Sequence, residues 1–192
     1  QYYQGGKVRV FPEKLSTVED VLITSPADGE VLKYDSAAAK WKNAAATGGG
    51  KLAQFVYTQT ASVITAAALI PADDTIPQQT EGTEAMTLSI TPTDASNLLE
   101  IEANLIIGHT GTDRHIAALF KDSDAGAIAA SFSYTSNDTL KLKYIVSAGS
   151  KTARTYKVRF GSPTSYPALN GSLSRCLGGS AVSTFTIKEI TP

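Results

Sequence analysis

The residues of this chain that could do chemistry are few. Its two histidines, His109 and His115, lie in one short segment with Asp113 between them. Imidazole and carboxylate groups bind several divalent ions, so the three could hold a metal ion across a symmetry axis. The general aptitude of histidine as a ligand is the only argument for such a site, and we therefore predict no metal.

Motifs for covalent and nucleotide chemistry are absent from the sequence. Gly50-Lys51 is followed by Leu52 and lacks the spacing of a phosphate-binding loop, and no Gly-x-Ser-x-Gly motif occurs. The single cysteine, Cys176, excludes an intrachain disulfide and a multi-thiolate zinc site. Acidic residues are present, but no spacing selects a pair of them for glycoside hydrolysis. These observations predict a protein that is not an enzyme and carries no cofactor.

The composition argues against two further classes, nucleic-acid-binding proteins and membrane-inserted proteins. The chain has 192 residues, of which 18% are charged, with 17 basic and 18 acidic side chains and a pI near 6.1. A protein whose main task is to bind nucleic acid would show a basic excess. No run approaches the roughly 18 apolar residues of a membrane span. We therefore expect no nucleic acid partner and no membrane insertion.

The elements that must position the polar residues are strands. From Lys51 onward, apolar residues alternate with period two, and no helical stripe is found there. Eight segments are expected as strands: 55–65, 86–91, 98–107, 114–121, 127–135, 140–147, 154–160 and 183–190. Antiparallel strands of this length predict an all-β fold, a jelly-roll-like double-sheet sandwich. Residues 51–192 would form this head.

Residues 1–50 differ in character and are expected to form an N-terminal arm, which ends in a flexible run of glycines. Ser16-Thr17-Val18-Glu19 has the spacing of a helix capping box. Val18, Val21 and Leu22 are accordingly expected on the apolar side of one or two helical turns. So short a helix needs a partner to be stable.

A small β-hairpin is expected in the same arm, from residues 31–35 and 40–43, with Tyr34 and Trp41 as its packing pair. An isolated hairpin is marginal in water, so the arm is expected to pack on a partner or on a symmetry mate. The residues expected to make this attachment are Val18, Val21, Leu22, Tyr34 and Trp41.

Several of the predicted strands are apolar on both faces. In the segment 98–107, Leu98 and Ile106 flank polar residues on one face, and Ile145 is a similar outlier. Either the sheet is covered by loops of the same chain or it meets another subunit.

Charge is also unevenly distributed along the sequence. An acidic set (Asp73, Asp74, Glu81, Glu84, Asp94, Glu100 and Glu102) precedes a basic set (Lys141, Lys143, Lys151, Arg154, Lys157 and Arg159). Opposite signs on two flanks of one domain would suit a head-to-tail ring, and an ordinary mixed surface is the alternative.

Two stretches resemble tailed-bacteriophage virion proteins. The first resembles a module repeated along phage fibres and comprises Leu15-Ser16-Thr17-Val18-Glu19-Asp20-Val21, Gly29-Glu30-Val31-Leu32-Lys33-Tyr34-Asp35 and Lys40-Trp41-Lys42-Asn43. The second resembles the C-terminal head domain of tail-fibre proteins and includes Phe55-Val56-Tyr57-Thr58-Gln59-Thr60, Met86-Thr87-Leu88-Ser89-Ile90-Thr91-Pro92 and Tyr156-Lys157-Val158-Arg159. The resemblance implies a homotrimeric knob on the virion, assembled in the bacterial cytoplasm and joined to other virion proteins by its arm. It implies no catalytic residues.

The strand order also predicts a tip. If residues 55–65 form one strand, both ends of the head lie at its base, and residues 108–114, 135–139 and 161–182 gather at the opposite end; a break at Ala61 would reverse this. The candidate receptor-binding residues there are His109, Asp113, Tyr134, Asn137, Tyr166 and Asn170. Aromatic and amide groups can stack on sugars and bond their hydroxyls, although ordinary turns also contain them.

Two functions follow from the sequence as hypotheses. The first is a trimeric fibre or knob that attaches the phage to a host-surface glycan or protein. The alternative is a capsid decoration protein that stabilises or decorates the particle.

Overall fold

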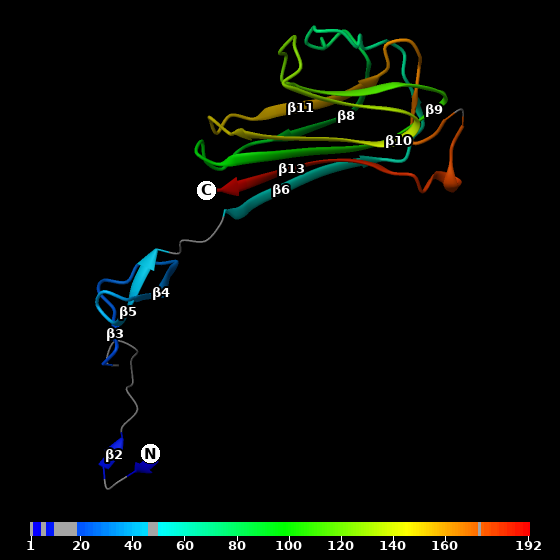
Figure 1. Cartoon of the computed structure of the whole chain (residues 1–192). Helices are drawn as coiled ribbons and strands as arrows, with labels where there is room; N and C mark the ends of the chain where they lie inside the picture. The colour runs from blue at the N-terminus through cyan, green and yellow to red at the C-terminus, as the bar shows by residue number, and fades with distance from the viewer. Residues whose placement is uncertain (1, 5–6, 10–18, 46–49, 173) are drawn as a thin grey trace. The chain divides into compact units, whose positions relative to one another are not determined.

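The computed structural model describes residues 2–4, 7–9, 19–45, 50–172 and 174–192. They belong to two compact units, Gln1–Gly49 and Gly50–Pro192, called the arm and the head below. Among these residues the regular elements are strands, apart from one 3-10 turn, η2, at Leu177–Gly179 (Figure 1). The described part contains no helix long and apolar enough to cross a membrane. The chain is therefore all-β, as the sequence predicts.

The arm contains the predicted hairpin. Strands β4 (Glu30–Asp35) and β5 (Lys40–Ala45) pair antiparallel, with Tyr34 opposite Trp41. The two rings meet edge to face with centroids 5.4 Å apart, a favourable aromatic geometry. A separate pair of short strands, β1 (Tyr2–Gln4) and β2 (Lys7–Arg9), lies at the N-terminal end of the chain.

The helix predicted around Val21 and Leu22 is wrong for those two residues. They form β3 (Val21–Leu22), which runs parallel to β5. The free edge of β5 explains this, because Trp41 N donates to Asp20 O at 2.8 Å and the Asn43 side chain bonds both the N and the O of Thr24. These bonds favour an extended backbone over a helical turn. Val18 lies outside the described residues.

The strands of the head form two layers. The long strands are β6 (Lys51–Thr60), β8 (Thr83–Ile90), β9 (Leu98–Lys121), β10 (Ala129–Ser147), β11 (Arg154–Gly161) and β13 (Ser183–Thr191). The first layer runs β6, β13, the first half of β9 and the second half of β10. The second layer runs β8, β11, the second half of β9 and the first half of β10. Numbered as the eight predicted strands, the layers are 1-8-3-6 and 2-7-4-5, which is jelly-roll connectivity.

Three strand boundaries differ from the prediction. Residues 98–107 and 114–121 are halves of one strand, β9, and the strands predicted at 127–135 and 140–147 are likewise joined in β10. The long hairpin bends from one layer to the other at a register shift between Thr135 and Asn137. The strand predicted at 55–65 is broken, because β6 ends at Thr60 and β7 (Ile64–Thr65) pairs with β12 (Ala168–Leu169).

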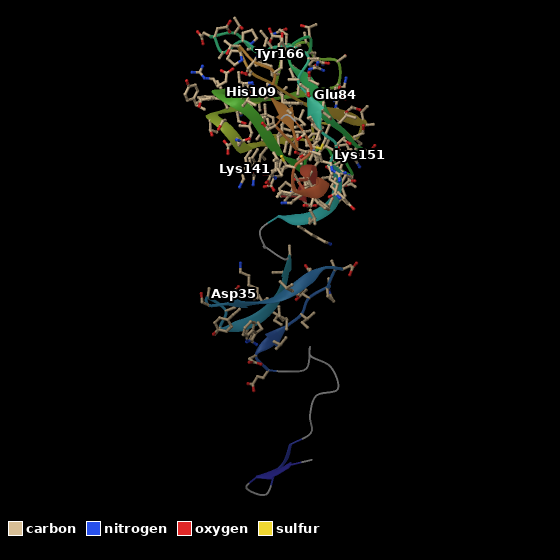
Figure 2. The ribbon with its side chains drawn as sticks, turned by 90° about the vertical axis from the view of Figure 1, so that its right-hand side faces the viewer. Asp35, Glu84, His109, Lys141, Lys151 and Tyr166 are labelled. Atoms are coloured by element: carbon tan, nitrogen blue, oxygen red, sulfur yellow. The ribbon has the colours of Figure 1, made fainter. Side chains whose placement is uncertain are left out.

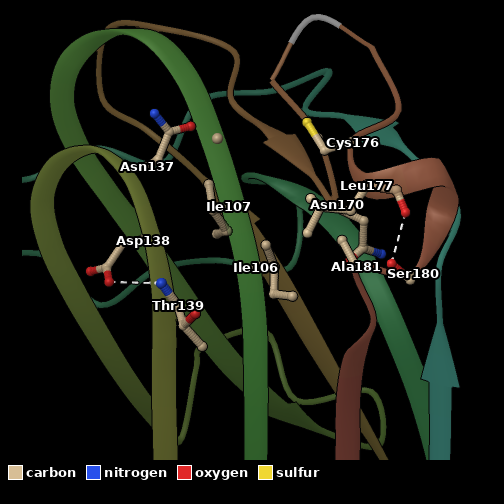
Figure 3. A pocket seen from close by; sticks show the side chains of 12 residues that line it. Ile106, Ile107, Asn137, Asp138, Thr139, Asn170, Cys176, Leu177, Ser180 and Ala181 are labelled. Carbon is tan, nitrogen blue, oxygen red and sulfur yellow. Dashed lines mark hydrogen bonds between the residues drawn. The ribbon is translucent and has the colours of Figure 1, made fainter.

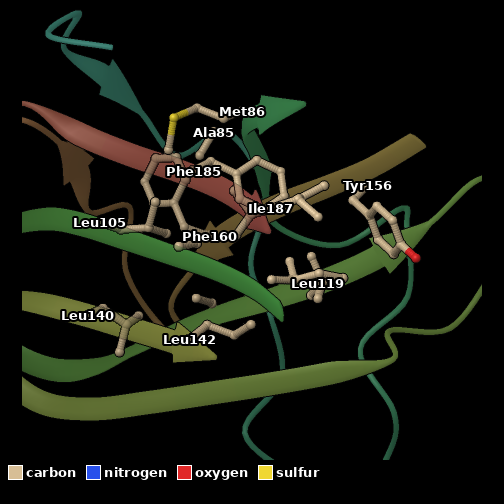
Figure 4. Packing of buried hydrophobic residues seen from close by; sticks show 14 of the residues in the cluster. Ala85, Met86, Leu105, Leu119, Leu140, Leu142, Tyr156, Phe160, Phe185 and Ile187 are labelled. Atoms are coloured by element: carbon tan, nitrogen blue, oxygen red, sulfur yellow. The ribbon is translucent and has the colours of Figure 1, made fainter. Parts of the chain in front are cut away.

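The core fills the space between the layers. Alternate residues of each strand point inward, including Leu105 and Leu119 from β9, Leu142 from β10 and Phe185 and Ile187 from β13 (Figure 4). Each such side chain contributes about 1.5–3 kcal/mol by leaving water. This packing holds the two sheets together without a disulfide.

The outward faces of the two layers both carry apolar residues, but these residues are covered on one layer and exposed on the other. On the outside of the second layer, Ile116, Ala118 and Phe120 are buried, and residues 71–77 of the same chain line hollows beside this sheet. The outside of the first layer is open, since Leu98 and Ile145 are exposed there. Residues 71–77 therefore account for the apolar outward face of the second layer and not for that of the first layer.

Of the two alternatives for the charged residues, the structure supports the ordinary mixed surface. Strands far apart in the sequence are neighbours in a jelly roll, so members of the two sets meet. Three ion pairs join them: Lys143–Glu100 at 2.7 Å, Lys151–Asp94 at 3.6 Å and Arg159–Glu84 at 3.9 Å. The sequence-based argument for a head-to-tail ring is thereby lost.

A buried carboxylate closes the base of the head. The side chain of Glu189 on β13 is fully buried and accepts hydrogen bonds from Asn97 Nδ2 at 2.6 Å, Gln54 Nε2 at 2.5 Å and Thr93 N at 2.8 Å. Burial raises the pKa of Glu189, but these hydrogen bonds outweigh it and lower the pKa to about 2. Glu189 thereby ties β13 to β6 and to the turn before β9.

Candidate functional site

The head has a base and a tip. At the base, Lys51 pairs with Thr191, so the head begins and ends at the same edge. At the other end of the strands, Thr60 pairs with Ser183, and Gly108 pairs with both Asn137 and Ala168. The predicted tip segments thus lie together, and the break after Thr60 does not reverse the arrangement, because β7 stays at this end through its pairing with β12.

Residues 108–113 and 136–139 fall between predicted strands, but the structure includes them in strands β9 and β10. Four residues, 109–112, lie opposite Ser136 at the bend. Gly108 is required here, because a Cβ at this position would come 2.3 Å from Gly171 O. The glycine lets residues 168–171 lie directly against β9.

A pocket of about 570 Å³ opens at the tip, between the bends of β9 and β10 and the loop that carries η2 (Figure 3). Its floor is apolar, with Ile106 and Ala181, and its edge carries Asn137 and Asp138. Asn137 is exposed, and the Asp138 carboxylate accepts from Thr139 N at 2.7 Å. The pocket therefore offers amide and carboxylate groups around an apolar base, as ligand sites commonly do.

Asp113 serves the fold. Its carboxylate accepts hydrogen bonds from the hydroxyls of Ser162, Thr164 (2.7 Å) and Ser165 (2.6 Å) and from Arg114 N at 2.7 Å. Burial raises the pKa of Asp113, but the hydroxyl donors outweigh it and hold the pKa well below its usual range. Asp113 fastens the loop after β11 to β9, and its oxygens are engaged within the chain.

Asn170 is also engaged within the fold. It is buried, with a left-handed φ of 56°, although it lines the tip pocket. Its Nδ2 donates to Thr60 O at 2.8 Å and Ser62 O at 3.1 Å, and its Oδ1 accepts from Ser183 Oγ at 2.7 Å. This amide joins three segments of the tip, so we do not assign it a ligand contact.

The two histidines have different surroundings. His109 is partly exposed at the bend, and its Nδ1 lies 3.0 Å from Gly111 O (Figure 2). His115 is fully buried opposite Ser133, and its ring nitrogens have no hydrogen-bond partner within the described structure. Burial, followed by the charge of His109, lowers the pKa of His115. Among the described residues, no group of three or more His, Cys, Asp or Glu side chains could hold a metal ion.

The exposed aromatic candidates lie apart from the tip pocket. Tyr166 is exposed in the loop after β11, which Figure 2 shows from the tip side. Tyr134 projects from the outside of the second layer, with Phe132 on the same face of β10 and Arg114 on the neighbouring strand. The sequence reasoning missed Phe132 and Arg114. The alternation of aromatic and serine residues in Ser131-Phe132-Ser133-Tyr134 was the available signal.

Comparison with known proteins leaves the family open. No family model matches the chain, and no curated protein matches it. One solved structure, the infectious bursal disease virus VP2 subviral particle, is similar with 9% identity over 84% of this chain and a TM-score of 0.29. This chain spans 44% of that one. At such a score the likeness carries no argument about function.

Proposed function

We propose that this protein is a non-enzymatic structural component of a bacteriophage virion, a homotrimeric knob whose tip attaches to a glycan or protein of the host surface. The main support for this proposal is that the start of the head and the pocket lie at opposite ends of its strands. The arm continues into Gly50, whose position beside Thr191 marks the base, and the pocket of about 570 Å³ lies at the other end of the strands. A head held at its base presents that pocket outward.

The open face of the first layer supports self-association. Phe55 and Tyr57 stack on β6 with centroids 5.7 Å apart and are 48% and 64% exposed. Leu52, Leu98 and Ile145 are exposed on the strands of the same layer. Large exposed apolar side chains on one face mark interaction sites, and here the ion-paired Lys188 and Glu100 lie between Phe55 and Ile145. We assign this face to contacts between the subunits of the proposed trimer.

The arm suits attachment to another virion protein. Among its described residues 19–45, none is buried, and Leu22, Val31, Tyr34 and Trp41 are exposed. A three-stranded sheet with this much apolar surface in water gains stability from a partner. We propose that these residues contact the rest of the particle.

Binding of the labelled full-length protein to host cells tests this function. The expected result is saturable binding that Asn137→Ala weakens and Lys151→Ala, at the base, does not. Binding to no cell, together with particles that become fragile without the protein, would replace this proposal with the capsid decoration function.

A further inference from the structure

A second hollow lies on the outside of the second layer. It has a volume of about 220 Å³ and lies between residues 71–77 and the strands β9 and β10. Ile116 forms part of its lining, and Arg114 and Phe132 line it from neighbouring strands. This face is opposite to the one assigned to subunit contacts, so the trimer proposed above leaves it open.

Arg114 carries a positive charge that the surrounding chain does not neutralise. No carboxylate of the described residues lies within ion-pair distance of its guanidinium. The neighbouring Asp113 points to the other side of the strand, toward the hydroxyls of the loop after β11. Asp73 also lines the hollow, but it does not pair with Arg114, and its Oδ1 instead accepts from Thr75 N and Oγ1; its negative charge therefore stays in the hollow beside the arginine.

The arginine is nevertheless held in place. Its Cζ lies 5.3 Å from the ring centroid of Phe132, and its Nη1 is 3.5 Å from Ala72 O. Its Nε is buried and has no hydrogen-bond partner within the described structure. A guanidinium that is oriented, uncompensated and short of a partner is suited to a bidentate bond with a carboxylate.

Two aromatic rings flank this guanidinium. Phe132 is 67% exposed and Tyr134 is 69% exposed, both on the outward face of β10. Tyr134 is directly opposite Arg114 in the antiparallel register, where side chains are close neighbours. Such rings offer flat apolar surface, and the tyrosine adds a hydroxyl for hydrogen bonding.

We propose that Arg114, Phe132 and Tyr134 form a binding site for an acidic saccharide, with the guanidinium on the sugar carboxylate and the rings against the apolar faces of the sugar units. The hollow has only about 220 Å³, with the exposed ring of Phe132 in its lining and the exposed ring of Tyr134 opposite Arg114, which favours a saccharide chain over a deeply inserted group. This inference rests on the proposed function and goes beyond it, because it adds a second contact for the host glycan and names the chemical class of that glycan. The site is separate from the pocket at the tip.

Calorimetry of the full-length protein with matched saccharides tests the site. The probes are oligogalacturonate, hyaluronan and α2,8-linked sialic acid oligosaccharides, each compared with its carboxyl-reduced form. We expect at least one acidic probe to bind and its reduced form to bind roughly tenfold or more weakly, as loss of a charged hydrogen-bonded pair predicts. Failure of all three acidic probes at millimolar concentration overturns the proposal.

Variants then assign the binding to these residues. Arg114→Gln is expected to weaken binding by roughly tenfold or more, and Arg114→Lys by less, because the charge remains while the bidentate geometry is lost. Phe132→Ala and Tyr134→Ala should each weaken it severalfold. Lys151→Gln removes an exposed cation at the base and should leave binding unchanged; equal losses in Lys151→Gln and Arg114→Gln would overturn the assignment.

The outcomes also separate this inference from the proposed function. Binding to host cells that Arg114→Gln leaves intact would overturn the saccharide site and keep the attachment function. Binding of acidic probes without any binding to host cells would keep the site and overturn the attachment function.

Discussion

At the residue scale, the head contains two acidic side chains that hold distant segments together without a cationic partner. Glu189 closes the base, and Asp113 fastens the loop after β11 at the tip. Both stay ionised because neutral donors surround them, which offsets the cost of burying a charge. Each carboxylate should therefore stabilise the fold only while it remains deprotonated.

Glu189 gives the head an acid-sensitive stability. Its pKa is about 2 in the folded protein against an ordinary 4.5, so its contribution is full above pH 4.5 and is lost as the pH falls to about 2. Glu189→Gln should lower the free energy of unfolding at pH 7 by about 3 kcal/mol. Urea denaturation at several pH values measures this. If the difference in the free energy of unfolding between the wild type and Glu189→Gln did not shrink toward pH 2, this explanation would be wrong.

His115 should act in a different pH range. Because burial lowers its pKa below 6.5, the unfolded chain binds the proton more readily, and stability should fall as the pH drops through 6.5. His115→Leu should flatten the pH dependence there, and thermal unfolding between pH 8 and pH 5 measures it. His109→Gln is the control that should keep most of the slope, because the charge of His109 is only the second cause of the lowered pKa of His115. If only the control removed it, the assignment to His115 would be wrong.

At the element scale, the sequence predicts the strands well and their continuity poorly. Period-two alternation located the core faces of β9 and β10, because inward residues such as Leu99 and Leu142 must be apolar. Gly108 and Asn137 fall between predicted strands, yet they lie at a bend inside paired strands. Residue type alone does not distinguish a turn from a bulge, because pairing with the neighbouring strand determines which of the two forms.

The candidate site was predictable only in part. The predicted strand order places Asn137 and Tyr166 at the tip, where the structure has them, because the connections between strands determine which strand ends lie together. Asp113 and Asn170 were interpreted as ligand contacts, but their partners, such as Ser165 and Thr60, come from elsewhere in the chain. A single sequence does not show which polar side chains are already bonded.

The arm and the head should unfold separately. Trp41, the single tryptophan of the chain, lies in the arm, where none of residues 19–45 is buried. Its fluorescence in urea should change at a lower concentration than the far-UV circular dichroism, which the head dominates, because sheets with few buried contacts open first. Coincident transitions would contradict this and indicate one cooperative unit.

At the scale of the whole molecule, the open face of the first layer should determine assembly. Phe55→Ser combined with Tyr57→Ser is expected to convert the proposed trimer into monomers, because it removes exposed apolar area from that face. Sedimentation velocity measures the mass. Phe132→Ser, on the other layer, should leave the trimer intact, and a wild-type protein that sediments as a monomer would refute the trimer itself.

The most direct test of the central claim is competition for adsorption. Host cells are incubated with excess purified full-length protein and then exposed to the phage that is proposed to carry it. The account predicts that adsorption falls in a saturable manner and that Asn137→Ala protein competes less well. Undiminished adsorption at concentrations where the protein is intact and trimeric would contradict attachment as its function.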